Sequence, residues 1–157
     1  FNTIKEAVEA LDAFRTREGE VLRADVSAKV ENIKLFVDKV EEYEKERILA
    51  VKERLRSRIE ELSITPDQNR LEQEIVFYVE KLDINEEKVR LRQHCAYFME
   101  TIDSEQYLGK KIGFMAQEMG REINTTGSKA NHAVIQRWLV RMKDELEKIK
   151  EQALNIL

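Results

Sequence analysis

Apolar residues recur along the chain at intervals of three or four positions, the spacing of one face of an α-helix. A short first stripe stands near the start (Ile4, Val8, Leu11 and Phe14). After an interruption at Arg17-Glu18-Gly19, a second stripe makes eleven steps over 40 residues (Leu22, Val26, Val30, Ile33, Val37, Val40, Glu44, Ile48, Val51, Leu55, Ile59 and Leu62). This pattern predicts a long, nearly straight helical arm over residues 1–62, with roughly 60 Å of length in the second stripe alone. So narrow a seam requires a partner helix or another subunit, and Glu44, which breaks it, is expected in a salt bridge or at the edge.

Residues 63–157 are predicted to form a helical C-terminal domain after a marked break. Thr65-Pro66-Asp67-Gln68 is typical of a capping box, with Thr65 as the N-cap. The helix that follows is expected to bury one face (Leu71, Ile75, Tyr78 and Leu82). Asp83 with Glu86 repeats the capping pattern and predicts a further helix over residues 85–99.

That helix carries two side chains of chemical interest. Glu87 and His94 stand seven residues apart and therefore on the same side, bordered by Leu91 and Phe98. A histidine at the edge of an apolar face fits both a buried structural residue and a metal ligand or acid–base group.

The stretch 109–131 is the least ordinary part of the chain. One face of its predicted helix is apolar (Leu108, Ile112, Met115, Ala116, Met119 and Ile123), and the other is polar (Lys110, Lys111, Gln117, Glu118, Arg121, Glu122 and Thr125). Phe114 stands among the charged residues. Gly127 suits a left-handed position after the helix, and Ser128 suits the N-cap of the next one. The converging polar groups fit a phosphate or metal site, and they equally fit a well-capped helix–turn–helix corner.

The last helix is predicted to start near Ser128 and to run to the end of the chain. Its apolar positions step four and three residues in turn, over three heptads (Ile135, Leu139, Met142, Leu146, Ile149, Ala153 and Ile156). This coiled-coil-like stripe predicts packing against the arm or against a neighbouring chain. The predicted fold class is therefore all-α.

Composition narrows the class of protein. Of 157 residues, 37% are charged and 42% are hydrophobic, with one proline, which is typical of a soluble helical protein. The net charge is −4, but residues 107–157 hold nine basic and six acidic side chains, so a polyanion should prefer this end. Cys95 is the single cysteine, which fits a reducing cytoplasm. The longest apolar run, 75–79, is too short to span a membrane, and the start at Phe1 inside a helical pattern suggests a piece of a longer protein. P-loop, GxGxxG and HExxH motifs are absent.

Three stretches carry a resemblance to a known family. They are NRLEQEIVFYVEKLDINEEKVRLRQHCAYF, GKKIGFMAQEMGREINTTGSKAN and KDELEKIKEQALNI. Together they strongly resemble the C-terminal half of the bacterial YicC family. The resemblance implies an all-helical half of a metal-dependent endoribonuclease that favours manganese, with magnesium as the alternative, acts on RNA and assembles as a homo-oligomer, expected to be a hexamer. Activity is expected of the complete protein and need not reside in this chain alone. One departure is Asn131, where aspartate is common in the family, so Asn131 is left out of the metal set.

RNA cleavage needs a group that prepares the nucleophile and positive charge where the phosphorane forms. With the family's activity in view, Glu118 and Glu122 are expected to hold the metal. His94 is expected to ligate the metal or to act as general acid or base. Residues predicted to contact RNA are Lys110, Lys111, Phe114, Arg121, Asn124, Ser128 and Lys129. A rival interpretation is a non-catalytic RNA-binding or oligomerisation module, in which Glu118, Arg121 and Glu122 form a structural salt-bridge corner.

Overall fold

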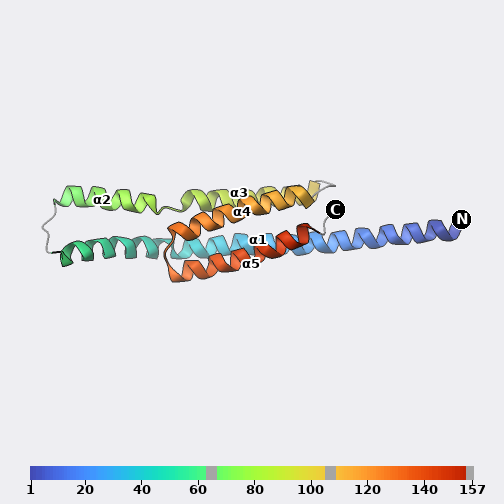
Figure 1. The fold of residues 1–157 in the computed structure, drawn as a ribbon, viewed down its shortest axis with the longest axis horizontal. Helices are drawn as coiled ribbons and strands as arrows, with labels where there is room; N and C mark the ends of the chain where they lie inside the picture. The colour runs from blue at the N-terminus through green and yellow to red at the C-terminus, as the bar shows by residue number, and fades with distance from the viewer. Residues whose placement is uncertain (63–66, 105–108, 155–157) are drawn as a thin grey trace.

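The computed structural model describes residues 1–62, 67–104 and 109–154, and these residues form five α-helices and no strand (Figure 1). The helices are α1 (Asn2–Glu61), α2 (Gln68–Lys81), α3 (Asn85–Ser104), α4 (Gly109–Lys129) and α5 (Ala133–Ala153). The predicted all-α class with one long N-terminal helix is confirmed. None of the described helices is long and apolar enough to cross a membrane.

The molecule is elongated because α1 runs along its whole length (Figure 1). The middle of α1 packs against α5 and α3, and α4 closes the bundle by packing against both of these helices. Beyond the bundle, α2 lies beside the C-terminal end of α1, and the N-terminal part of α1 extends alone (Figure 1). The core therefore lies in the four-helix part of the molecule.

The buried face of α1 follows heptad spacing. Its buried positions step four and three residues in turn (Val26, Val30, Ile33, Val37, Val40, Glu44 and Arg47). After Glu44 the fully buried row passes through Arg47, and the predicted seam continues as half-buried positions at Ile48, Val51, Leu55 and Ile59. The spacing continues through the charged residues, and Glu44 occupies a salt bridge, one of the two environments expected for it.

The stripe of α5 is buried as predicted (Ile135, Leu139, Met142, Leu146, Ile149 and Ala153). It packs against α1 and α4, so the arm, one of the two partners considered, covers it. Each such side chain contributes about 1.5–3 kcal/mol when fully buried. The Trp138 ring packs on Phe36 of α1 with centroids 5.4 Å apart. Ile156 lies outside the described residues.

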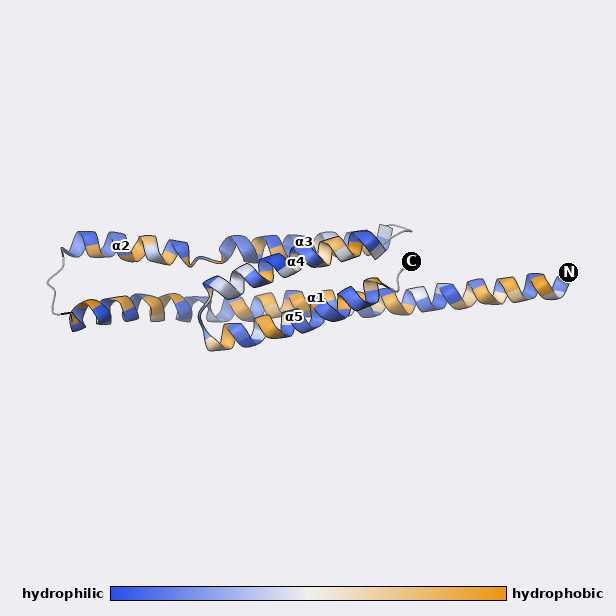
Figure 2. Ribbon diagram, in the orientation of Figure 1, coloured by the Kyte–Doolittle hydropathy of each residue, from blue (hydrophilic) through white to orange (hydrophobic). Residues whose placement is uncertain are grey.

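The first stripe of α1 remains exposed. Ile4, Val8 and Leu11 are 70, 52 and 49% exposed, and Phe14 is 53% exposed. Figure 2 shows hydrophobic residues recurring along this uncovered part of the helix. A contiguous exposed apolar stripe of this kind is typical of a surface that meets a partner.

α2 begins one residue after Asp67, whose carboxylate accepts a hydrogen bond from the backbone N–H of Asn69 at 3.0 Å. The proposed capping residues Thr65 and Pro66 lie outside the described residues. Ile75 is buried as predicted, but the predicted burial of Tyr78 is wrong, because it is 45% exposed. The reason is that α2 packs on α1 alone, which covers only a narrow stripe.

The start of α3 follows the predicted capping pattern. The Asp83 carboxylate accepts from the backbone N–H of Asn85 at 3.0 Å. The helix runs to Ser104, five residues beyond the predicted end at Met99. Leu91, Cys95 and Phe98 are buried on its inner face.

The corner between α4 and α5 differs from the prediction. Gly127 and Ser128 lie inside α4, which ends at Lys129, and α5 begins at Ala133 with His132 as its N-cap. The predicted helix start at Ser128 is therefore wrong. The side-chain amide of Gln136 explains the longer helix, because it donates to the carbonyl oxygens of Gly127 and Ala130 at 2.9 and 2.7 Å and so satisfies the helix end without a left-handed glycine.

Candidate active site

The contact between α3 and α4 places His94 beside Glu122. The Nε2 atom of His94 lies 4.0 Å from Oε1 of Glu122, and Nη1 of Arg90 lies 3.9 Å from the same oxygen. Arg90 and His94 are one turn apart on α3 and therefore face the same part of α4. Arg90 also pairs with Glu86 one turn earlier. The convergence that the catalytic hypothesis required is thus present for His94 and Glu122.

Glu122 itself differs from the prediction, which placed it on the charged outer face of α4. It is 5% exposed, and it follows Met115 and Met119 on the buried row that ends at Thr126. The steps of four, three and four residues keep these positions on one side of the helix, whatever their polarity. A buried carboxylate is costly unless it has partners. Here the partners are the side chains of Arg90 and His94.

Glu118, the other proposed metal ligand, lies on the outer side of α4. Its Oε1 is 3.6 Å from Nη2 of Arg121, and the two side chains are 25 and 69% exposed. Within the described ranges, no group of three or more His, Cys, Asp or Glu side chains is arranged to hold a metal ion. Of the three proposed metal ligands, His94 and Glu122 lie beside each other and Glu118 lies on the outer side of α4. The assignment of a metal to these residues stays a prediction.

Most residues predicted to contact RNA are accessible on α4. The exposed ones are Lys110, Phe114, Arg121, Asn124 and Ser128. Lys111 is half-buried and places its Nζ 5.6 Å from the centre of the Tyr97 ring. The Ser128 hydroxyl donates to the carbonyl oxygen of Asn124 at 3.1 Å, so it does not offer the helix N-terminus that was expected to hold phosphate.

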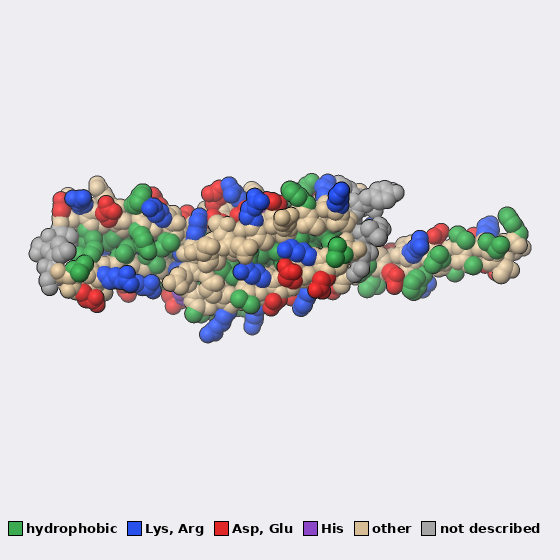
Figure 3. Space-filling model, in the orientation of Figure 1, with side chains coloured by type: hydrophobic (Ala, Val, Ile, Leu, Met, Phe, Trp, Pro, Cys, Tyr) green, Lys and Arg blue, Asp and Glu red, His purple; other side chains and the backbone are tan. Residues whose placement is uncertain are grey.

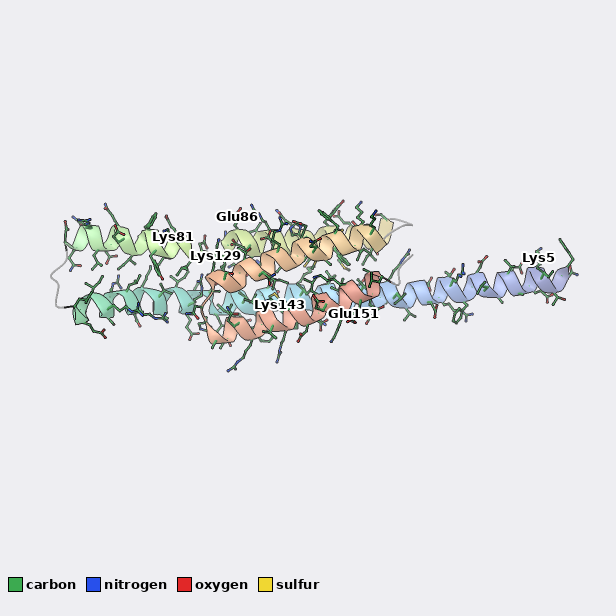
Figure 4. All side chains as sticks on the ribbon, in the orientation of Figure 1. Lys5, Lys81, Glu86, Lys129, Lys143 and Glu151 are labelled. Carbon is green, nitrogen blue, oxygen red and sulfur yellow. The ribbon has the colours of Figure 1, made fainter. Side chains whose placement is uncertain are left out.

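Lys129 lies at the end of α4, near the start of α3, where Figure 4 labels Glu86. Its Nζ donates to Oε1 of Glu87 at 2.6 Å and to the carbonyl oxygen of Asp83 at 3.3 Å. Glu87 is buried, and Lys129 supplies its counter-charge. Lys129 remains 33% exposed at its side chain, which leaves it within reach of solvent.

Arg47 is the centre of a second buried polar group. Its Nη2 donates to Oε1 of Glu44 at 2.6 Å and to the carbonyl oxygen of Leu82 at 2.7 Å, and its Nη1 donates to the carbonyl oxygen of Lys129 at 3.2 Å. One side chain of α1 thus fastens both the α2–α3 connection and the end of α4. The buried atoms Arg47 Nε, Glu44 Oε2 and Glu87 Oε2 have no hydrogen-bond partner among the described residues.

Three groups with shifted pKa values, those of Cys95, Glu41 and Arg92, lie away from these clusters. Burial raises the pKa of the Cys95 thiol to about 12, so this thiol is protonated at neutral pH and is a poor nucleophile. The pKa of Glu41 is lowered, chiefly by its hydrogen bond with Arg92. Arg92 donates to Asp38 and Glu41 at 2.9 and 2.7 Å, and these pairs hold α3 against α1.

The arginines that α1 contributes beside the end of α4 were not predicted from the sequence. Arg54 and Arg58 line a pocket together with Arg47 and Lys129. The signal was present in the spacing, since Arg47, Arg54 and Arg58 are separated by seven and four residues and therefore share one face of a helix.

Comparison with known proteins connects these features to a family. Residues 40–157 match the family described as "Endoribonuclease YicC-like, C-terminal". The chain is 38% identical over 156 residues to "Probable endoribonuclease YicC" of Clostridioides difficile, covering 98% of this chain and 53% of that protein. It is 33% identical over 144 residues to the protein of the same name from Haemophilus influenzae, covering 92% of this chain and 50% of that protein. The chain spans about half the length of these relatives.

Proposed function

Because the chain belongs to the YicC-like endoribonuclease family, we propose that it is the C-terminal portion of a metal-dependent endoribonuclease that cleaves RNA phosphodiester bonds. The match of residues 40–157 to the C-terminal family carries this proposal. Two relatives named as probable endoribonucleases support it. The pairing of His94 with Glu122 supports a location for the chemistry on the α3–α4 face.

His94 is proposed as the general acid or base. Histidine is the side chain that most often moves protons in enzymes, and a carboxylate beside the ring can set its orientation. The position of Glu122 supports this proposal, because its Oε1 lies 4.0 Å from the ring nitrogen and it belongs to a buried row of α4. Arg90 is half-exposed, so its guanidinium can turn from Glu122 toward a phosphate oxygen.

As the alternative to acid–base catalysis by His94, we propose that His94 and Glu122 hold a divalent metal ion, Mn²⁺ or else Mg²⁺, with Glu118 one turn along as a further carboxylate. The donor types fit, because manganese accepts both imidazole nitrogen and carboxylate oxygen. Ions of this kind often bind one or two protein carboxylates together with substrate phosphates and water, so a third contacting residue is not a requirement. When bound, the ion would polarise the phosphoryl oxygen as a Lewis acid.

RNA is proposed to lie along the exposed side of α4. The cations Lys110, Lys111 and Arg121 would neutralise phosphates, and Phe114, 62% exposed, would stack a base. Asn124, Ser128 and Lys129 would continue this track toward the end of the helix. A cytoplasmic location follows from an RNA substrate and belongs to the same proposal.

The test compares cleavage of a labelled RNA by the complete gene product with manganese, with magnesium and with a chelator. Glu122→Gln and His94→Ala should each lower metal-dependent cleavage by about 10²-fold or more, since positioned proton transfer contributes at least that factor. Glu100→Gln is the matched control, because it removes one exposed carboxylate from α3 away from the pair. Circular dichroism checks that each variant is folded. Undiminished cleavage in folded Glu122→Gln and His94→Ala would remove the chemistry from this face.

A non-catalytic RNA-binding module is the second candidate. The burial of Glu122 between Arg90 and His94 favours it, because the same contacts would serve as a structural salt bridge. This candidate predicts salt-sensitive RNA binding without cleavage. It also predicts that Glu122→Gln lowers the unfolding midpoint of the protein.

The exposed apolar stripe at the start of α1 supports assembly into a homo-oligomer, with a hexamer expected from the family resemblance. Apolar side chains 49–70% exposed along one helix face gain stability when another copy covers them. Light scattering should give a smaller mass for the double variant Val8→Asp/Leu11→Asp than for the unaltered protein. An unchanged mass would exclude this stripe as the contact.

A further inference from the structure

A pocket of about 280 Å³ opens between the C-terminal end of α1, α2 and the end of α4. Its cations are Arg47, Arg54 and Arg58 of α1 and Lys129 of α4, and Tyr78 of α2 supplies an aromatic ring. Among the described residues that line it, none is acidic. The pocket therefore concentrates positive charge at an end of the molecule where two connections meet α1.

Two of these four cations lack a counter-charge among the residues that the structure describes. Arg47 pairs with Glu44 and Lys129 pairs with Glu87, each at 2.6 Å. In contrast, neither Arg54 nor Arg58 forms a side-chain hydrogen bond or an ion pair within the described parts of the chain. Two uncompensated guanidinium groups one turn apart match the charge and the oxygen geometry of a phosphate group.

Arg47 is fixed at the wall of this pocket by its own contacts. Arg47 is 2% exposed, and three oxygens accept hydrogen bonds from its terminal nitrogens. Its buried Nε has no partner among the described residues. This nitrogen is enclosed and out of reach of a ligand, so Arg47 contributes to the pocket by holding its wall in place.

An apolar pocket of about 270 Å³ adjoins the cationic one and shares Leu55 and Tyr78 with it. Its other apolar side chains are Ile59, Leu71, Ile75 and Phe77. The rings of Tyr78 and Phe77 are 45 and 54% exposed. Figure 3 shows hydrophobic side chains along the line where α1 and α2 meet, with Lys and Arg side chains beside them. A cationic half thus continues into an apolar, aromatic half.

We propose that the two adjoining pockets bind one nucleotide unit of single-stranded RNA, with its phosphate at Arg54 and Arg58 and its base against Tyr78. Cations that hold the backbone beside an aromatic ring that stacks a base are the elements of single-strand recognition. The base must be unstacked to enter, so a duplex does not fit. The inference rests on the proposed function, which makes RNA the substrate, and adds a binding site to it.

The site is an anchor separate from the His94–Glu122 pair. Glu87, which pairs with Lys129 at the pocket, precedes His94 by seven residues on α3, about 10 Å along the helix. A strand held in the pocket would therefore pass the proposed catalytic face only a short distance along its backbone. Anchoring beside the reacting bond lowers the entropic cost of positioning it.

Fluorescence anisotropy of the complete gene product tests this site. The probe is a short labelled 2′-O-methyl oligoribonucleotide, which resists cleavage, in the presence of a chelator. The double variant Arg54→Gln/Arg58→Gln should raise Kd by about tenfold or more and lower the salt dependence by about 0.7 per lost phosphate contact. Arg56→Gln is the matched control on the same helix, because Arg56 pairs with Glu72 and does not line the pocket. It should leave Kd within about twofold, as expected of an exposed pair.

Tyr78→Leu tests the base. The variant keeps apolar bulk but removes the ring, so it should raise Kd about fivefold or more for the ordinary oligonucleotide, the factor expected for one lost stacking contact. It should leave the Kd of an abasic oligonucleotide unchanged. A Tyr78→Leu variant that binds both probes as the unaltered protein does would reduce the pocket to an anion site and overturn the proposal.

The cleavage assay separates this proposal from the catalytic one. Weaker binding in Arg54→Gln/Arg58→Gln, with cleavage unaffected in Glu122→Gln, would retain the anchor and reject the proposed catalytic face. Metal-dependent cleavage lost in Glu122→Gln, with equal Kd in the Arg54→Gln/Arg58→Gln and Arg56→Gln proteins, would reject the anchor. Arg54 and Arg58 are exposed, so their replacement should leave the unfolding midpoint unchanged, and circular dichroism checks this.

Discussion

Replacing Arg47 by methionine should destabilise the bundle by about 3–5 kcal/mol, because it leaves Glu44 as an unpaired buried charge. Nη2 of Arg47 lies 2.6 Å from Oε1 of Glu44, and the two side chains are only 3 and 11% exposed. The carbonyl oxygens of Leu82 and Lys129 lose their guanidinium donor in the same variant. Methionine retains the length and apolar character of the side chain, so electrostatic and hydrogen-bonding losses dominate the change.

A second variant separates these two losses. In Glu44→Met/Arg47→Met neither member of this buried pair carries a charge, so the double variant should be more stable than Arg47→Met alone. It should stay less stable than the unaltered protein, because the carbonyl oxygens of Leu82 and Lys129 still lack a donor.

Urea unfolding followed by circular dichroism measures these free energies of unfolding. The control is Arg56→Met, which breaks the pair with Glu72, where the side chains are 48 and 55% exposed. Such a pair contributes about 1 kcal/mol or less. If Arg47→Met costs no more than Arg56→Met, the buried guanidinium does not hold the connections together and the reasoning is refuted.

Three further predictions concern the helices and the titrating groups. Gly113→Ala should raise the free energy of unfolding by about 0.5–1 kcal/mol, since an added Cβ meets nothing within 4 Å. Gly120→Ala should gain less stability, because its Cβ would lie 3.2 Å from Leu146 Cδ2. Equal gains for the two variants in urea unfolding would contradict this. The pKa of Glu41 is lowered below its ordinary value of 4.5, so its pair with Arg92 contributes stability above about pH 4.5 that is lost as the pH falls through the lowered pKa. The stability difference between the unaltered protein and Arg92→Gln should therefore be larger at pH 7 than at pH 3, and a difference independent of pH would argue against the pair. Cys95, with a pKa raised to about 12, should react with a thiol reagent near pH 8 only after the protein is unfolded, so rapid modification of the native protein would contradict its burial.

Hydrophobic periodicity predicted most of the fold. The stripes of α1 and α5 lie in the core because apolar residues at heptad spacing bury the same face over many turns. The errors occurred where the spacing and the residue type disagreed. Arg47 and Glu122 both continue a row of steps of three and four residues, yet the prediction put Glu122 on the charged face and did not include Arg47 in the seam. Following the spacing through charged residues would have placed both correctly.

The helix ends depended on contacts that no local pattern contains. Gly127 suited a helix end by its conformational freedom, but Gln136, nine residues later, satisfies the carbonyl groups and lets α4 continue. The pairing of His94 with Glu122 likewise depends on how α3 packs against α4. The arginines of the α1–α2 pocket share a helix face in the sequence, but their meeting with Tyr78 and Lys129 depends on the tertiary fold.

The unbroken α1 helix also fixes the distance between the exposed stripe and the cationic pocket. Val8 in the exposed stripe and Arg54 in the pocket are 46 residues apart on one helix, which corresponds to about 70 Å along its axis. Copies joined through the stripe in antiparallel orientation would hold their pockets at opposite ends of the assembly, whereas parallel copies would hold them side by side. Nucleotide sites at opposite ends would select an RNA by its length and flexibility more than by its sequence.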